Sequence, residues 1–254
     1  MSNVTFKRDG DVGVVTLAKP PHNLIDDALL SDLLAAYKQA VDGGCRSILL
    51  RSEMRHFCAG ADVTAFTNGG QRRDQKGFEK LLSDLEDVSL PTVAAVHGAA
   101  LGGGVELALT CDMIIASDTA TFAMSESSIG LMPLLGGVQR VVQRVGLPRA
   151  KELAMFGRRN DPAMLERWGM INLVTPEAEL PTVSMSWARQ LAQGPTVALL
   201  GIKRLANLSA RDGLGAADKV QLETNGQMWA SKDQKRGLKA FMQTGPGTAV
   251  FEGN

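Results

Sequence analysis

Apolar positions along the first 195 residues follow two alternating patterns. Some segments carry apolar side chains at every third or fourth position, the period of an amphipathic helix; residues 26–42, followed by Gly43-Gly44, are the clearest case. Others are short, mostly aliphatic runs of the kind found in strands. The patterns predict strands over 12–17, 47–51, 92–96, 113–116, 121–124 and 171–174, and helices over 26–42, 78–88, 103–110, 138–145, 148–156 and onward from Asp161-Pro162.

Strand signals end near Pro181. From there the apolar period is helical throughout, which predicts helices over 182–193, 196–208, 214–230 and 233–243. Alternation of strands and helices predicts the α/β class for residues 1–195, followed by an all-helical C-terminal region, residues 196–254. The order of the strands in the sheet does not follow from these local patterns.

The charge balance narrows the possible partners. Twenty-seven basic residues match 27 acidic ones, so the formal net charge is zero, which argues against nucleic acid as the main partner. The most apolar segment, residues 93–115, is interrupted by His97, Glu106 and Asp112 and by several glycines, so no membrane span is predicted. A net charge near zero also favours a defined oligomer over a free monomer.

The cysteines and histidines indicate neither disulfides nor a metal site. Cys45, Cys58 and Cys111 are too few and too scattered for a disulfide framework, and they form no CxxC pair of the kind that binds zinc. The three histidines lack a metal-ligand spacing. Reduced thiols are the simplest interpretation, and they predict a cytoplasmic protein.

The first candidate for chemistry is the run Gly102-Gly103-Gly104, between a predicted strand and a predicted helix. A helix N-terminus presents unpaired N–H groups, so this turn suits an anion or a developing oxyanion. It matches neither a phosphate-binding GxxxxGK[ST] loop nor the GxGxxG dinucleotide motif. A tight strand-to-helix corner without further function is the alternative.

Two carboxylates lie near this turn in the predicted elements. Glu106 follows Gly103 by three residues, about one helical turn, within an otherwise apolar helix. A buried carboxylate is costly, so Glu106 is expected to be paired or functional, with a helix-dipole partner as the plainer role. Glu126 follows the strand 121–124 and is either a solvated turn residue or the second half of an acid/base pair.

Taken together, these motifs resemble the enoyl-CoA hydratase/isomerase (crotonase) family over about residues 5–243. The resemblance rests on residues 57–62 (FCAGAD), residues 96–108 (VHGAALGGGVELA), Cys111-Asp112 and Glu126, with Gly136-Gly137 and Gln139-Arg140. It implies a core of ββα spiral turns, with residues 196–254 serving oligomerisation and site cover. It also implies trimers or dimers of trimers, and an acyl-CoA thioester as substrate.

The resemblance also implies roles for individual residues. The N–H groups of Ala61 and Gly103 would form an oxyanion hole for the thioester carbonyl, and Glu106 and Glu126 would manage one water molecule. The stretch Ala59, Gly60, Ala61 and Asp62 would line the CoA site, Lys19 is a candidate for a CoA phosphate, and Met132 and Leu134 are candidates for the acyl pocket. No cofactor is expected, because coenzyme A is part of the substrate.

Three departures from the family pattern bear on the reaction. Leu134 stands where the hydratases commonly have glycine, which narrows the space near the water and acyl group. Ser125 stands where proline is frequent, and the usual basic C-terminal stretch is replaced by residues 243–247 (QTGPG). Hydration of a 2-enoyl-CoA is the leading hypothesis, because both glutamates are present. Double-bond isomerisation, another acyl-CoA lyase reaction and a non-catalytic acyl-CoA-binding subunit are the alternatives.

Overall fold

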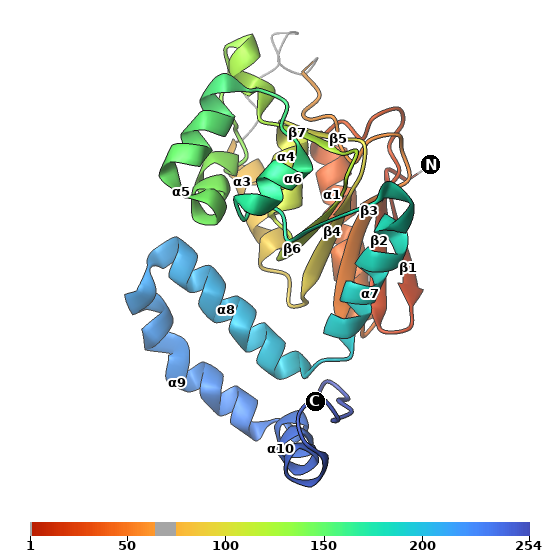
Figure 1. Cartoon of the computed structure of the whole chain (residues 1–254), viewed down its shortest axis with the longest axis vertical. Helices are drawn as coiled ribbons and strands as arrows, with labels where there is room; N and C mark the ends of the chain where they lie inside the picture. The colour runs from red at the N-terminus through yellow and green to blue at the C-terminus, as the bar shows by residue number, and fades with distance from the viewer. Residues whose placement is uncertain (1, 64–74) are drawn as a thin grey trace.

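A computed structural model describes residues 2–63 and 75–254, with the backbone alone for 75–79. Its core is a six-stranded sheet with the strand order β1-β2-β3-β4-β6-β8 (Figure 1). Strands β1 and β2 pair antiparallel to each other, and all other neighbouring strands pair in parallel. The strands of this sheet are β1 (Val4–Asp9), β2 (Val12–Leu17), β3 (Ser47–Ser52), β4 (Thr92–Val96), β6 (Met113–Ser117) and β8 (Leu173–Thr175).

Helices follow the strands and then form the C-terminal region. The α-helices are α1 (Asp27–Asp42), α3 (Gln75–Glu86), α4 (Gly103–Leu109), α5 (Gly137–Phe156), α6 (Pro162–Arg167), α7 (Leu180–Ala192), α8 (Thr196–Asp212), α9 (Leu214–Ala230) and α10 (Lys232–Thr244). Two short 3₁₀ helices are η1 (Ser125–Ile129) and η2 (Glu177–Glu179). The two helices predicted over 138–156 lie within α5, which breaks at Gly146.

The sheet is covered on both faces, because alternate residues of its strands enter two different apolar clusters. Ile48 and Leu50 of β3 point to the larger cluster, with α1 and α4, whereas Leu49 between them points to a smaller one. The smaller cluster is closed by α7 through Leu180 and Ala188. Because both faces of the sheet are buried, the sequences of its central strands are almost entirely apolar.

A second, two-stranded sheet pairs β5 (Ala99–Leu101) with β7 (Thr121–Ala123) in parallel. Strand β5 was not predicted, because its three residues are enclosed by Gly98 and Gly102 and its pairing partner is distant in sequence. Both flanking glycines have positive φ, 60° and 48°, which favours glycine. The strand leads directly into α4 and so sets the position of the glycine-rich turn.

The C-terminal helices α8, α9 and α10 lie to one side of the sheet (Figure 1). Helix α8 contacts the core through Lys203, whose ammonium donates to Asp112 Oδ2 and to the carbonyl oxygen of Leu90, both at 3.0 Å. An ion pair between Arg211 and Asp87 adds a second contact. The division into regions 1–195 and 196–254 stays a prediction.

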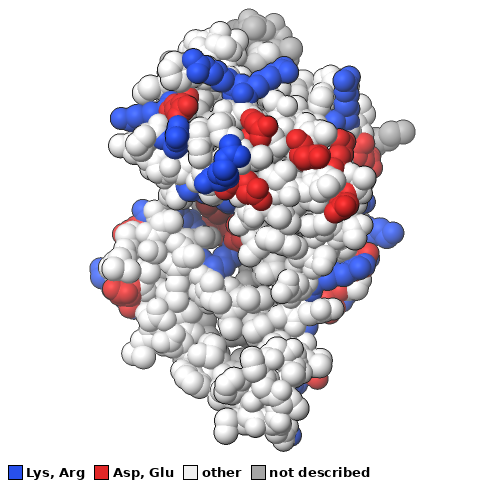
Figure 2. Space-filling view, in the orientation of Figure 1, with Lys and Arg blue, Asp and Glu red and all other residues white. Residues whose placement is uncertain are grey.

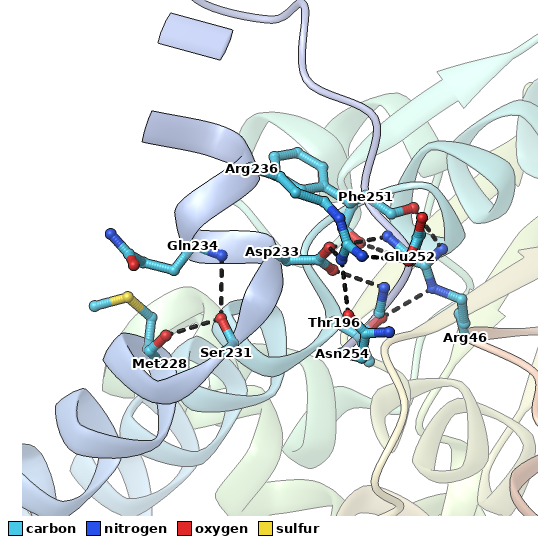
Figure 3. A network of polar contacts seen from close by, with 12 residues as sticks. Arg46, Thr196, Met228, Ser231, Asp233, Gln234, Arg236, Phe251, Glu252 and Asn254 are labelled. Carbon is cyan, nitrogen blue, oxygen red and sulfur yellow. Dashed lines mark hydrogen bonds and ion pairs between the residues drawn. The ribbon is translucent and has the colours of Figure 1, made fainter. Parts of the chain in front are cut away.

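The C-terminal tail returns to the core (Figure 3). Asp233, at the start of α10, is fully buried and accepts the N–H groups of Glu252 at 2.9 Å and Gly253 at 2.6 Å. Arg46, just before β3, donates to the carbonyl oxygen of Phe251 at 3.0 Å and to Thr196 Oγ1 at 3.0 Å. The tail thus joins α10 to the start of the central strand β3 and to the start of α8.

In the described part of the chain, no helix combines the length and apolar character needed to cross a membrane.

Candidate active site

The loop between β2 and α1 is held against the loop after β3 by one buried side chain, Asn23. Its Nδ2 donates to Ser52 Oγ at 2.8 Å and to the carbonyl oxygen of Phe57 at 2.9 Å, and its Oδ1 accepts the N–H of Lys19 at 2.8 Å. The side chain is fully buried, and its backbone has a φ of 54°. Asn23 was not predicted to matter, although asparagine is among the few residues that tolerate this conformation.

These contacts bring the predicted CoA segment, Ala59 to Asp62, beside the glycine-rich turn. Ile25 donates its N–H to the carbonyl oxygen of Gly60 at 2.9 Å and accepts the N–H of Asp62 at 3.0 Å. Cys58 accepts the N–H of Leu101 at 3.0 Å. The 58–62 segment therefore lies between residue 25 on one side and β5 on the other.

Ala61 and Gly103, the two predicted oxyanion-hole residues, meet where these segments pass. A Cβ on Gly103 would lie 3.5 Å from the Ala61 nitrogen, and a Cβ on Gly60 would lie 3.9 Å from the Gly103 nitrogen. Among the described residues, the backbone hydrogen bonds include none donated by Ala61 or Gly103. Two N–H groups that have no backbone acceptor in the described part of the chain therefore lie close together, one of them at the N-terminus of α4.

Glu106 lies one turn into α4 and is 2% exposed. Its Oε1 accepts the N–H of Leu135 at 2.9 Å and the N–H of Gly137 at 2.8 Å, at the start of α5. Burial raises the pKa of Glu106 from 4.5 to about 7; the two N–H groups oppose this rise and the charge of Glu126 adds to it. Glu106 is thus both a cap for α5 and an acid that titrates near neutral pH.

Glu126, in η1, faces the same turn from the other side. Its carboxylate packs on Gly102, where a Cβ would lie 2.9 Å from Oε1. Its Oε2 is buried and accepts no hydrogen bond from the part of the chain that the structure describes. Burial raises the pKa of Glu126 as well. Glu126 therefore lies near enough to Glu106 for its charge to raise the Glu106 pKa, whereas the acid/base pair stays a prediction.

Apolar side chains border the turn between the two acids. Ile25 Cδ1 and Leu135 Cδ1 would lie 3.1 and 3.6 Å from a Cβ on Gly103, and both side chains are buried. Neither was predicted, because each reaches the turn across a long sequence separation. Of the residues predicted for the acyl pocket, Leu134 is half-buried and Met132 is 64% exposed.

Lys19 is close to the predicted CoA segment but already engaged. Its ammonium forms an ion pair with Asp26 Oδ2 at 2.7 Å and donates to the carbonyl oxygen of Leu24 at 2.9 Å. Asp26 also caps α1 by accepting the N–H of Leu29. A phosphate would have to compete with these contacts, so the predicted role of Lys19 toward CoA stays a prediction.

Two buried thiols and His97 have structural surroundings. Burial raises the pKa of Cys58 to about 12 and that of Cys111 to about 11, so neither thiol is poised to ionise near neutral pH. His97 Nε2 lies 2.8 Å from the carbonyl oxygen of Met54. Within residues 2–63 and 75–254, no group of three or more His, Cys, Asp or Glu side chains is arranged to hold a metal ion.

This arrangement suits one kind of chemistry. Two unpaired N–H groups can stabilise negative charge that develops on a carbonyl oxygen. Two carboxyl groups with raised pKa values near the same turn can give and take protons. Fold and site together define a class of α/β proteins in which a glycine-rich turn, with N–H groups that lack a backbone acceptor in the described chain, lies beside two carboxyl groups with raised pKa values.

Comparison with known proteins identifies the family. The family model for enoyl-CoA hydratase/isomerase matches residues 7–253, and the chain belongs to this family. A probable enoyl-CoA hydratase of Bacillus subtilis is 30% identical over 250 residues, covering 96% of each chain. Carnitinyl-CoA dehydratase of Proteus mirabilis is 31% identical over 242 residues, covering 92% of this chain and 93% of that one.

The fold comparison agrees. An enoyl-CoA hydratase crystal structure from Geobacillus kaustophilus superposes with a TM-score of 0.92 at 32% identity, covering 99% of this chain and 98% of that chain. The predicted crotonase-type α/β core with a helical C-terminal region is therefore confirmed.

Proposed function

We propose that the protein is an enoyl-CoA hydratase that adds water across the 2,3 double bond of a 2-enoyl-CoA thioester. The observation that carries this proposal is the convergence of Glu106 and Glu126 on the turn where the N–H groups of Ala61 and Gly103 lie unpaired. Hydration requires negative charge on the thioester oxygen, one proton removed from water and one proton delivered to the α-carbon. The site offers a group for each requirement.

The two amides are proposed to act on the thioester carbonyl. As water adds to carbon 3, electron density moves to the thioester oxygen, and the N–H groups of Ala61 and Gly103 stabilise the enolate. Removing one such donor in comparable sites costs about 3–4 kcal/mol of transition-state stabilisation. The CoA moiety is proposed to run along Ala59 to Asp62, and the acyl chain beside Leu134, with Met132 further out.

The two acids are proposed to divide the proton transfers. Glu106 is assigned as the base that orients the water, because two N–H donors hold its carboxyl group in place and a pKa of about 7 leaves it partly ionised at neutral pH. Glu126 is assigned as the acid, because its buried Oε2 accepts no hydrogen bond from the described residues and so favours a proton. Hydration is proposed to require Glu106 ionised and Glu126 protonated, and the charge of Glu126 would raise the pKa of Glu106 if both were ionised.

Turnover of a panel of 2-enoyl-CoA thioesters of increasing chain length tests the proposal. Loss of the conjugated enoyl-thioester absorbance is expected for at least one chain length. Glu106→Gln and Glu126→Gln should each lower kcat by about 10²–10⁴-fold. The division of roles is tested by α-proton exchange with solvent on the saturated acyl-CoA: equal loss of exchange and hydration in both variants would reject it.

A second candidate is double-bond isomerisation, for which the replacement of the usual glycine by Leu134 is the specific observation. A bulkier side chain near the water position favours proton transfer between carbons over water addition. Conversion of a 3-enoyl-CoA to the conjugated 2-enoyl-CoA without hydration would support this reaction. Binding of CoA esters without any turnover would instead support a non-catalytic subunit.

We further propose that the protein self-associates through α8, α9 and α10. These helices carry large exposed apolar side chains, among them Ile202, Leu222, Trp229 and Met242, with exposed fractions of 64, 83, 59 and 82%. The face of this region in Figure 2 is largely uncharged, whereas charges of both signs are scattered over the core. A trimer or dimer of trimers is the expected assembly, and a cytoplasmic location stays a prediction.

A further inference from the structure

The loop that binds Glu106 is itself held from behind by an arginine. Arg140, in the first turn of α5, donates through Nη1 to the carbonyl oxygens of Leu135 and Gly136, both at 3.3 Å. Its Nη2 forms an ion pair with Glu86 Oε2, at the end of α3, at 2.8 Å. The two side chains are only 16% and 17% exposed, so this pair is less screened by salt than an exposed ion pair.

A single peptide group connects Arg140 to Glu106. The carbonyl of Gly136, which accepts from Arg140, and the N–H of Gly137, which donates to Glu106 Oε1, belong to the same peptide plane. In a trans peptide these two groups point in opposite directions. The guanidinium therefore lies at one end of this peptide and the carboxylate at the other, and hydrogen bonds at the two ends polarise each other.

We propose that Arg140, anchored by Glu86, is a positioning residue for the acid pair: it fixes and polarises the Gly136–Gly137 peptide so that its N–H stabilises the carboxylate form of Glu106. The proposal rests on the proposed hydratase function, in which Glu106 is the base. Arg140 itself touches no reacting atom.

The charges around Glu106 predict how its pKa changes when Arg140 is replaced. Among the described residues, the charged groups that act on Glu106 are Glu126 from η1, which raises its pKa, and Arg140 from α5, which lowers it. Glu86 lies behind Arg140. Loss of the guanidinium therefore removes a favourable charge and loosens an N–H donor, and both changes shift the Glu106 titration upward from about 7.

The matched control lies one helical turn further along. Arg144 also donates to carbonyl oxygens, those of Cys111 at 2.6 Å and Met170 at 3.3 Å, but within the described chain it has no hydrogen bond to the loop at 135–137. Both arginines line a cavity of about 280 Å³ between α5 and α8, in the region where Figure 2 shows a hollow with charged side chains inside. Substitution of Arg144 is therefore the control that shows whether the loss of any arginine from this cavity, and not the contact of Arg140 with the loop, changes the Glu106 titration.

The experiment is a pH titration of Glu106 by carbon-13 NMR, in the full-length protein with labelled glutamate carboxyls and with the signal assigned through Glu106→Gln. Arg140→Gln is expected to raise the Glu106 midpoint, Arg140→Lys to raise it less, and Arg144→Gln to leave it unchanged. In hydration assays at pH 7, Arg140→Gln should lower kcat about tenfold and change KM less.

An unchanged midpoint in Arg140→Gln, or an equal shift in Arg144→Gln, would overturn the proposal. If Arg140→Gln does not fold, the same comparison is made between Arg140→Lys and Arg144→Lys. The titration needs no substrate, so its result stands apart from the hydration assay. If the Glu106 midpoint shifts in Arg140→Gln but the wild-type protein hydrates no enoyl-CoA, the proposed hydratase function is wrong. The effect of Arg140 on Glu106 would still be supported.

Discussion

Replacing Glu106 by glutamine is expected to stabilise the folded protein above neutral pH. The substitution removes a carboxyl group that is 2% exposed and that burial makes costly to ionise. Glutamine keeps an oxygen that can accept the N–H groups of Leu135 and Gly137, which now bond to Glu106 at 2.9 and 2.8 Å. The helix-capping contact therefore survives, while the buried charge does not.

The sign and size follow from the pKa of Glu106, which rises from 4.5 to about 7 in the folded protein. Because the folded state binds the proton more tightly than the unfolded state, this group's contribution to stability is complete below pH 4.5 and is lost as pH rises to about 7. At roughly 1.4 kcal/mol per pKa unit, the loss for the wild type is about 3 kcal/mol.

Urea unfolding at fixed protein concentration, followed by tryptophan fluorescence at pH 5 and pH 8.5, measures this effect. The stability of Glu106→Gln relative to the wild type should increase by up to about 3 kcal/mol from the lower to the higher pH. Glu179→Gln, at an exposed position, is the control for removing one negative charge. A relative stability of Glu106→Gln that is the same at both pH values would refute the reasoning.

Three further predictions concern the acid pair and the assembly. Glu126→Gln removes a like charge, so the pKa of Glu106 should fall below about 7, as measured by NMR titration; an unchanged pKa would mean that the acids are not coupled. Gly137→Ala places a Cβ 2.6 Å from Glu106 Cγ and should lower hydration at least about 100-fold at a stability cost of about 1–3 kcal/mol. Gly215→Ala, in α9, adds a Cβ that meets no distant part of the chain within 4 Å, so it should leave hydration unchanged and not lower stability. Leu222→Glu, at a side chain 83% exposed, should reduce the assembly size in light scattering, and an unchanged mass would place the interface elsewhere.

Much of the fold could be predicted because its elements have strong local signals. Helix α1 has a full apolar period, Asp26 as its cap and two glycines after its end, and the structure places it at Asp27–Asp42. Strand β5 has only three residues and depends on partners at residues 58 and 121–123. Pairing over such separations leaves no local pattern, so neither β5 nor the order of strands could be predicted.

The same distinction applies to the site. Glu106 and Gly103 could be selected because a carboxylate in an apolar helix and a glycine-rich turn are unusual on their own, whereas Glu126 became a candidate only beside a second carboxylate and through the family resemblance. Asn23 and Leu135 become important only through contacts between segments distant in the chain, with Ser52 and Phe57 in the first case and with the Gly103 turn in the second. Residue type alone does not reveal such contacts.

A crystal structure with a bound, unreactive CoA thioester tests the central claim most directly, because that claim is geometric. We expect the thioester oxygen to lie about 2.7–3.1 Å from the nitrogens of both Ala61 and Gly103, the range for an oxyanion site. Glu106 and Glu126 should lie on either side of carbons 2 and 3, with one water between them. A thioester oxygen bound away from either nitrogen, or acids turned away from those carbons, would contradict the account.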